Sequence, residues 1–168
     1  EHTSLPFVLI NLGEVARFQG KYSEAQKRAQ EGLEYARSLG DRMRMANAMQ
    51  SLGLTALDQT EVSAARSWLE QALNFYQTLG EKARVGLVQA ELGNVQLRLG
   101  ELEAAEQLFR ESLSLERVLG IKPAMVLALR GLSQVALLEG NYSEASERLL
   151  EGFALALEVS DLPTIVRY

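Results

Sequence analysis

The side chains that could perform acid–base or metal chemistry are few in this sequence of 168 residues. His2 is the only histidine and cysteine is absent, so a Ser–His–Asp triad has one terminal candidate and a thiolate nucleophile is excluded. The densest acidic group, Glu101, Glu103 and Glu106, falls where a helix is expected to begin, and the helix dipole favours acids there. No glycine-rich phosphate loop of the Walker type is present. We therefore expect no catalytic residues, no metal and no cofactor, and predict that the chain is not an enzyme.

Charge and hydropathy argue against two classes of partner. The net charge of −5 disfavours direct binding of nucleic acid, which requires a positive surface. No apolar run approaches the roughly 18 residues of a membrane span. The absence of cysteine fits a reducing compartment, and we expect a cytoplasmic protein. Because the sequence does not begin with Met and both its ends fall in phase with the repeat described below, we interpret it as a segment of a larger protein.

Cations recur at a fixed interval along the chain. His2, Arg42, Lys82 and Lys122 are 40 residues apart, and further arginines follow two of them at a distance of two residues. These positions lie at expected helix starts, where the dipole disfavours cations. Pairing with acids of neighbouring units, such as Asp41, is the favoured interpretation, and a basic edge for an acidic partner is the alternative.

The same 40-residue interval relates most of the chain to itself. Leu12-Gly13 recurs at Leu52-Gly53, at Leu92-Gly93 and, with serine, at Leu132-Ser133. A fixed period of this size is the signature of a repeat architecture. We predict one array over residues 1–168. Its repeats are 1–40, 41–80, 81–120 and 121–160, with the start of a fifth at 161–168.

Each repeat carries two patterns of an amphipathic helix. In the first pattern of the first repeat, Leu5, Val8, Leu9, Leu12 and Ala16 follow the i, i+3, i+4 spacing, and we expect this whole stripe to face the core. A glycine, Gly20, then predicts the end of the helix.

Serine residues predict where the second helix of a repeat begins. Ser23 and Ser63 have the chemistry of an N-cap, and Asp41 is expected to cap the first helix of the second repeat. In the second repeat Thr60 stands where Gly20 stands in the first. Each repeat is thus expected to be helix, short turn, helix, short turn.

The residues that recur at equivalent positions of the repeats resemble the pattern of the tetratricopeptide repeat. In the first repeat the matching residues are Leu9, Leu12, Gly13, Ala16, Ala25, Ala29 and Gly32. The usual Trp, Tyr and closing Pro are missing, and each unit has 40 residues where about 34 are typical. The longer unit, with its junction from Leu39 to Arg42, is similar to that of polarity adaptors that modulate G-protein subunits. It is also similar to sensor arms of bacterial signal-transduction ATPases and transcriptional activators.

The resemblance implies an all-α fold, a right-handed α-solenoid of stacked antiparallel helix pairs. It also implies a concave groove, lined by the first helix of each repeat, that binds peptides or helices of other proteins. The Lys and Asn that clamp carboxylates in chaperone adaptors are absent, since Ile10 and Glu14 stand in their places. The groove residues expected to recognise a partner are Asn11, Asn47, Gln50, Leu87, Asn94, Arg98, Leu127, Arg130 and Gln134.

Two functions remain open from the sequence. The favoured one is a non-catalytic protein–protein interaction scaffold that binds a peptide or helix in this groove. The alternative is a ligand-sensing regulatory arm of a signal-transduction ATPase or transcriptional regulator. Neither end of the array has a dedicated polar cap, so we also expect end-to-end self-association.

Overall fold

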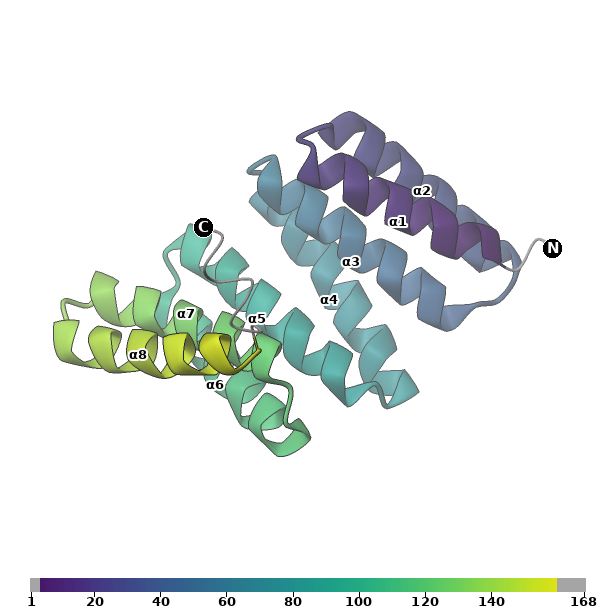
Figure 1. Cartoon of the computed structure of the whole chain (residues 1–168). Helices are drawn as coiled ribbons and strands as arrows, with labels where there is room; N and C mark the ends of the chain where they lie inside the picture. The colour runs from purple at the N-terminus through teal and green to yellow at the C-terminus, as the bar shows by residue number, and fades with distance from the viewer. Residues whose placement is uncertain (1–3, 160–168) are drawn as a thin grey trace. The chain divides into compact units, whose positions relative to one another are not determined.

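The computed structural model describes residues 4–159, in which eight helices and no strand occur (Figure 1). The helices are α1 (Leu5–Phe18), α2 (Tyr22–Ser38), α3 (Arg42–Asp58), α4 (Val62–Leu79), α5 (Lys82–Leu99), α6 (Leu102–Leu119), α7 (Lys122–Leu138) and α8 (Tyr142–Val159). Each repeat expected within residues 4–159 therefore holds one helix pair. His2 and the start of a fifth repeat at 161–168 lie outside the described residues.

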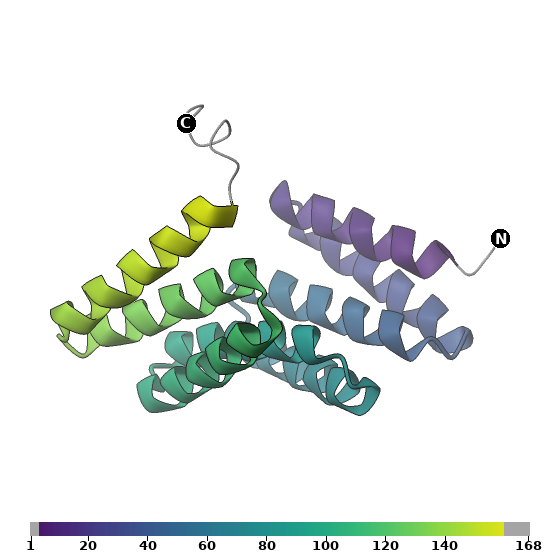
Figure 2. The same cartoon turned by 60° about the horizontal axis from the view of Figure 1, so that its bottom comes forward.

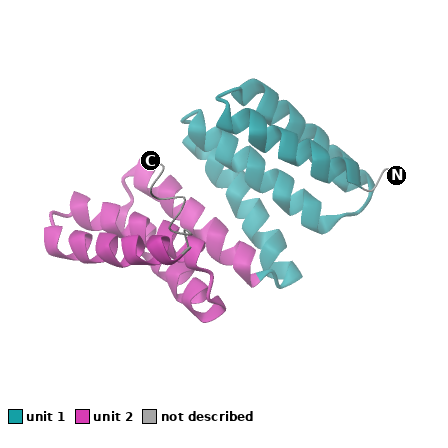
Figure 3. Cartoon of the chain, in the orientation of Figure 1, with its two compact units in different colours: residues 1–81 teal, residues 82–168 magenta. Residues whose placement is uncertain are grey.

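The chain divides into two compact units, residues 1–81 and 82–168 (Figure 3). In the first unit α2 packs against α1 and α3, and α3 against α4. In the second unit α6 packs against α5 and α7, and α7 against α8. Figures 1 and 2 both show the helices of a pair, such as α7 and α8, side by side. The first unit ends one residue after the expected end of the second repeat.

The short turns explain where the helices begin. Gly20 has φ 74°, and Thr60, in the same column, has φ 64° although threonine rarely adopts a left-handed backbone. The residue after each of these positions, Lys21 or Glu61, is the N-cap of the next helix, which starts one residue later at Tyr22 or Val62. The prediction that Ser23 and Ser63 are N-caps was therefore wrong, because both already lie in the first helical turn. The Asp41 cap is confirmed: the backbone N–H of Arg44 donates to Asp41 Oδ1 over 3.0 Å.

Small residues allow the helices to approach each other closely. The Phe109 ring, fully buried in the second unit, lies against Gly93 of α5 and Gly131 of α7. A Cβ built on Gly93 or Gly131 would come within 2.7 Å or 2.3 Å of this ring. In the first unit a Cβ on Gly13 would approach the carbonyl oxygen of Ala25 to 3.1 Å. The glycines that recur at Gly13, Gly53 and Gly93 are therefore packing sites between helices.

The apolar stripe expected to face the core from α1 is only partly buried. Leu9 and Ala16 are buried, but Val8 is 46% exposed and Leu12 49% exposed. Full burial of the stripe was a wrong expectation for these two residues. In α3, whose equivalent face is covered by α2, Leu52 is only 3% exposed.

Candidate functional site

The first helices of the repeats carry the residues predicted to recognise a partner. In the first unit, Asn11 on α1 is exposed. Asn47 and Gln50 on α3 instead accept hydrogen bonds from the Tyr76 hydroxyl of α4, over 2.6 Å and 2.9 Å. Gln50 is also buried. Two of the three predicted residues in this unit therefore hold α4 to α3.

The second unit brings the other six predicted residues onto two helices that contact each other, α5 and α7. Leu87 and Asn94 on α5 are partly buried, and the Asn94 amide donates to the Ala90 carbonyl oxygen over 3.2 Å. Leu127 on α7 is also partly buried and packs against the core cluster. The remaining three, Arg98, Arg130 and Gln134, are exposed.

The exposed polar residues of this surface are unpaired. Within residues 4–159, the side chains of Arg98, Arg130 and Gln134 make no hydrogen bond or ion pair. On α7, Leu138 follows Arg130 and Gln134 at intervals of four residues, so the three share one face of the helix, and Leu138 is 64% exposed. We call Asn94, Arg98, Leu127, Arg130, Gln134 and Leu138 the α5/α7 surface. It combines free guanidinium donors with apolar contact area.

A second surface was not predicted from the sequence. An open depression of about 360 Å³ in the second unit is lined by three arginines, Arg110 and Arg117 of α6 and Arg148 of α8. The rest of its wall is formed by Ser114 and by apolar side chains, among them Leu113 and Leu132. Its lining contains no acidic residue, so the depression can receive a carboxylate or another anionic group.

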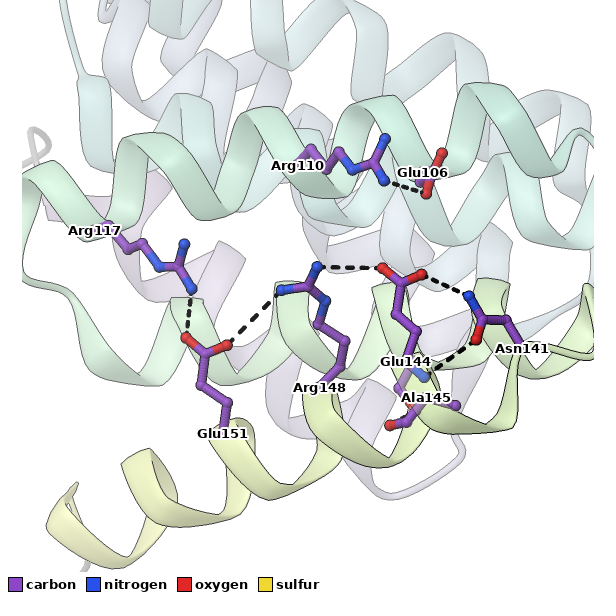
Figure 4. Close-up of polar contacts among 9 residues, drawn as sticks. Glu106, Arg110, Arg117, Asn141, Glu144, Ala145, Arg148 and Glu151 are labelled. Atoms are coloured by element: carbon purple, nitrogen blue, oxygen red, sulfur yellow. Dashed lines mark hydrogen bonds and ion pairs between the residues drawn. The ribbon is translucent and has the colours of Figure 1, made fainter.

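Each of these arginines is paired with a carboxylate of the chain (Figure 4). Arg117 pairs with Glu151 across α6 and α8, and Arg148 pairs with Glu144 over 3.2 Å. Arg148 is also 4.0 Å from Glu151, which is therefore shared between two arginines. The spacing of four residues between Glu144 and Arg148 is visible in the sequence. The Arg117–Glu151 pair joins residues that are 34 positions apart, and no local sequence pattern indicates it.

Among residues 4–159, the carboxyl group of Glu116 is buried without a hydrogen-bond partner. Glu116 of α6 is fully buried, and neither of its carboxylate oxygens has a hydrogen-bond partner. It lies over Gly86 of α5, on which a Cβ would come within 2.3 Å of Glu116 Oε1. Desolvation by burial raises the pKa of Glu116 above its ordinary value. The stability of the fold therefore depends on the protonation state of Glu116.

Two of the recurring cations near the starts of first helices pair within a single repeat. Arg44 pairs with Asp41 of the same helix over 3.1 Å, and Lys122 of α7 pairs with Glu158 of α8 over 2.8 Å. These two pairs join residues of one repeat, whereas the favoured interpretation placed such pairs between repeats.

Two kinds of functional feature are absent from the described part of the chain. No three His, Cys, Asp or Glu side chains among residues 4–159 are grouped so that they could hold a metal ion. None of the eight helices described is both long enough and apolar enough to cross a membrane.

Comparison with known families decides what the helix pairs are. A family model described as tetratricopeptide repeat matches residues 5–78 and 84–158. The chain belongs to the tetratricopeptide repeat family. The predicted family and the all-α repeat fold are thus confirmed. No curated protein matches the sequence.

Solved tetratricopeptide-like structures share the fold at low identity. Aspartyl phosphate phosphatase F from Bacillus subtilis superposes with TM-score 0.87 at 15% identity, over 96% of this chain and 43% of that one. BtubC from P. vanneervenii gives TM-score 0.80 at 16% identity, over 95% and 66% of the two chains. A Signal Transduction ATPase with Numerous Domains from Pyrococcus horikoshii, which has a tetratricopeptide repeat sensor, superposes with TM-score 0.79 at 16% identity. The match covers 94% of this chain and 24% of that one. The chain thus spans less than two thirds of the length of each.

Proposed function

We propose that this chain is a protein-interaction module whose α5/α7 surface binds a peptide or helix of a partner protein in the cytoplasm. The observation that supports the proposal best is the set of unpaired polar side chains on that surface, Arg98, Arg130 and Gln134, next to exposed leucine. Guanidinium groups form strong hydrogen bonds with carboxylates, and amides can pair with a peptide backbone in either direction. The partner segment is therefore acidic and carries apolar side chains for contact with Leu138.

The arginine-lined depression supports the same class of partner. Its three arginines already bind carboxylates of this chain, so an acidic segment can compete for their remaining N–H donors. Apolar side chains of the segment would contact Leu113 and Leu132 in its wall.

A capture experiment with matched variants tests the α5/α7 surface. The wild-type chain and the variant Arg98→Ala/Gln134→Ala serve as baits in a lysate of source cells, and bound proteins are quantified by mass spectrometry. The control, Arg37→Ala/Gln77→Ala, removes exposed residues of the same types from second helices of repeats. We expect a protein that the wild type and the control retain to be depleted about tenfold or more with the test variant, the effect of losing about 1.4 kcal/mol. Equal recovery with all three baits would contradict the proposal.

A second candidate is a regulatory arm that senses a ligand. It is supported by the likeness to a signal-transduction ATPase whose tetratricopeptide repeats are described as its sensor. In that case the arm would respond to a small ligand by a change of conformation. Small-angle scattering distinguishes the ligand sensor from the interaction module. The chain is measured before and after addition of a low-molecular-weight extract from the source cells. A changed scattering curve, with no partner lost from the Arg98→Ala/Gln134→Ala bait, would favour the sensor.

A further inference from the structure

The arginine-lined depression of the second unit lies mainly on α6 and α8, the second helices of their repeats. None of the nine residues predicted to bind a partner lines it, since all nine lie on first helices. Its basic side chains come from both helices, Arg110 and Arg117 from α6 and Arg148 from α8. A serine and three apolar side chains complete the lining, so every charge on its wall is positive. The depression is thus separate from the α5/α7 surface.

The polar residues of α6 converge on the middle of the depression. Arg110, Ser114 and Arg117 are spaced by four and three residues, which places them on one face of the helix. At a rise of 1.5 Å per residue, Ser114 lies about 6 Å along the axis from Arg110 and about 4.5 Å from Arg117. Figure 4 shows Arg117 of α6 and Arg148 of α8 extending toward Glu151, which pairs with both. Guanidinium groups from two helices therefore meet in one place.

Each of these guanidinium groups keeps unused donors. Arg110 and Arg117 each pair with one carboxylate, through Nη2 alone, and neither side chain makes another polar contact among residues 4–159. Arg148 donates from Nη2 to Glu144 over 3.2 Å, while its Nε has no hydrogen-bond partner. A guanidinium group carries five N–H donors, so the carboxylates of the chain leave most of them available to a ligand.

The carboxylates already present determine which kind of anion gains most from this site. A carboxylate of a partner can exchange with Glu106, Glu144 or Glu151, but it replaces one two-oxygen monoanion with another. A phosphorylated side chain carries a charge of about −1.5 to −2 at neutral pH and three strong acceptor oxygens. Opposite an arginine cluster such a group adds charge-assisted hydrogen bonds that a carboxylate cannot supply.

The shape of the depression indicates that the phosphate is carried on a chain. Sites for free small molecules enclose most of the surface of their ligand, whereas this depression of about 360 Å³ is open. Its apolar wall includes Leu113, Leu132 and Val118, and Val118 is 82% exposed. Apolar residues on either side of a phosphorylated one would find contact area there.

We propose that this depression binds a phosphorylated side chain of a partner protein. The three arginines donate to the phosphate oxygens, and apolar neighbours of the phosphorylated residue pack on Leu113 and Val118. The inference rests on the proposed function only in that the ligand is a segment of a protein. It uses no residue of the α5/α7 surface, so the two can fail separately.

Nuclear magnetic resonance of the isotope-labelled chain tests the proposal, because each arginine gives its own Nε–Hε signal. The chain is titrated with three peptides that differ only in a central residue flanked by leucines, which is phosphoserine, serine or glutamate. Inorganic phosphate is the fourth probe. We expect the phosphoserine peptide to shift the signals of Arg110, Arg117 and Arg148. It should bind about tenfold or more tightly than the other two peptides, and more tightly than inorganic phosphate.

Matched variants check that the depression is the site. Arg110→Gln/Arg117→Gln removes two guanidinium groups that are 58% and 51% exposed, so we expect it to fold, which circular dichroism checks. The control, Arg28→Gln/Arg66→Gln, removes arginines that likewise pair with glutamates, on α2 and α4. Affinity for the phosphoserine peptide should fall about tenfold or more in the first variant and stay unchanged in the control.

Three results would overturn the proposal. Equal binding of the glutamate and phosphoserine peptides would show that the depression accepts any carboxylate, and equal binding of inorganic phosphate would show a site for a free anion. A phosphoserine peptide that leaves the three arginine signals unmoved at about 1 mM would show that the depression binds no phosphorylated segment. The Arg98→Ala/Gln134→Ala bait of the capture experiment retains all three arginines, so the proposed function is judged independently.

Discussion

Thr60 adopts a backbone conformation that the equivalent positions of the other repeats leave to glycine. Its φ is 64°, beside 74° at Gly20, 78° at Gly100 and 77° at Gly140. A β-branched side chain in this region costs of order 1 kcal/mol or more. We expect Thr60→Gly to raise the free energy of unfolding by about 1 kcal/mol, measured by urea denaturation.

The reciprocal substitution provides the control for this effect. Gly100→Thr places the same side chain in the same turn of the third repeat and should lower the free energy of unfolding by about as much. If both variants shift the stability in the same direction, the backbone conformation is not the cause.

Glu116 makes the stability of the second unit depend on pH. Because burial raises its pKa, the folded chain binds the proton more tightly than the unfolded chain does. Stability contributed by this group is therefore lost as pH rises from the ordinary value of 4.5 through the raised one. We expect Glu116→Gln to be more stable than the wild type at neutral pH, with a difference that shrinks as pH falls toward 4.5. Thermal unfolding at a series of pH values measures this, and a difference that does not vary with pH would rule it out.

At the scale of the helix, replacement of glycine by alanine is expected to destabilise the chain at Gly131 and to stabilise it at Gly152. Gly131 of α7 faces the Phe109 ring, which Gly93 confines from the other side. Gly131→Ala should therefore destabilise the chain by about 1–2 kcal/mol, since overpacking of roughly 1–3 kcal/mol outweighs the helix propensity of alanine.

The comparison is Gly152→Ala on α8. Its added Cβ would lie 3.6 Å from the nearest atom, Leu129 Cβ, which is ordinary contact. Alanine should then stabilise the helix by about 0.5–1 kcal/mol. Thermal unfolding of the two variants checks both signs, and equal shifts would contradict the assignment of Gly131 as a close-packed site.

Periodicity predicted the helix pairs because these depend on residues repeated at equivalent places. It did not predict the exposure of Leu12, because burial depends on whether another helix lies over that face. It also did not predict that Asn47 and Gln50 would bind Tyr76. At the place of Tyr76 the first repeat has Ala36 and the third has Glu116, so the partner of those amides depends on one side chain of α4.

At the scale of the whole molecule, salt tests whether charge attraction drives the proposed partner binding. The chain carries a net charge of −5, so the molecule as a whole repels an acidic segment. Binding of such a segment to Arg98 and Arg130 therefore depends on local attraction between opposite charges at the α5/α7 surface.

Raising the ionic strength from about 0.01 M to about 1 M shortens the screening length from about 30 Å to about 3 Å. Over this range, the anisotropy of a fluorescent peptide of alternating Glu and Leu should report weaker binding to the wild-type chain, because the attraction to the guanidinium groups is screened. The variant Arg98→Ala/Arg130→Ala should bind more weakly at low salt and change less with salt. If binding of the peptide to the wild type does not weaken as salt rises, charge attraction at the α5/α7 surface does not hold the partner.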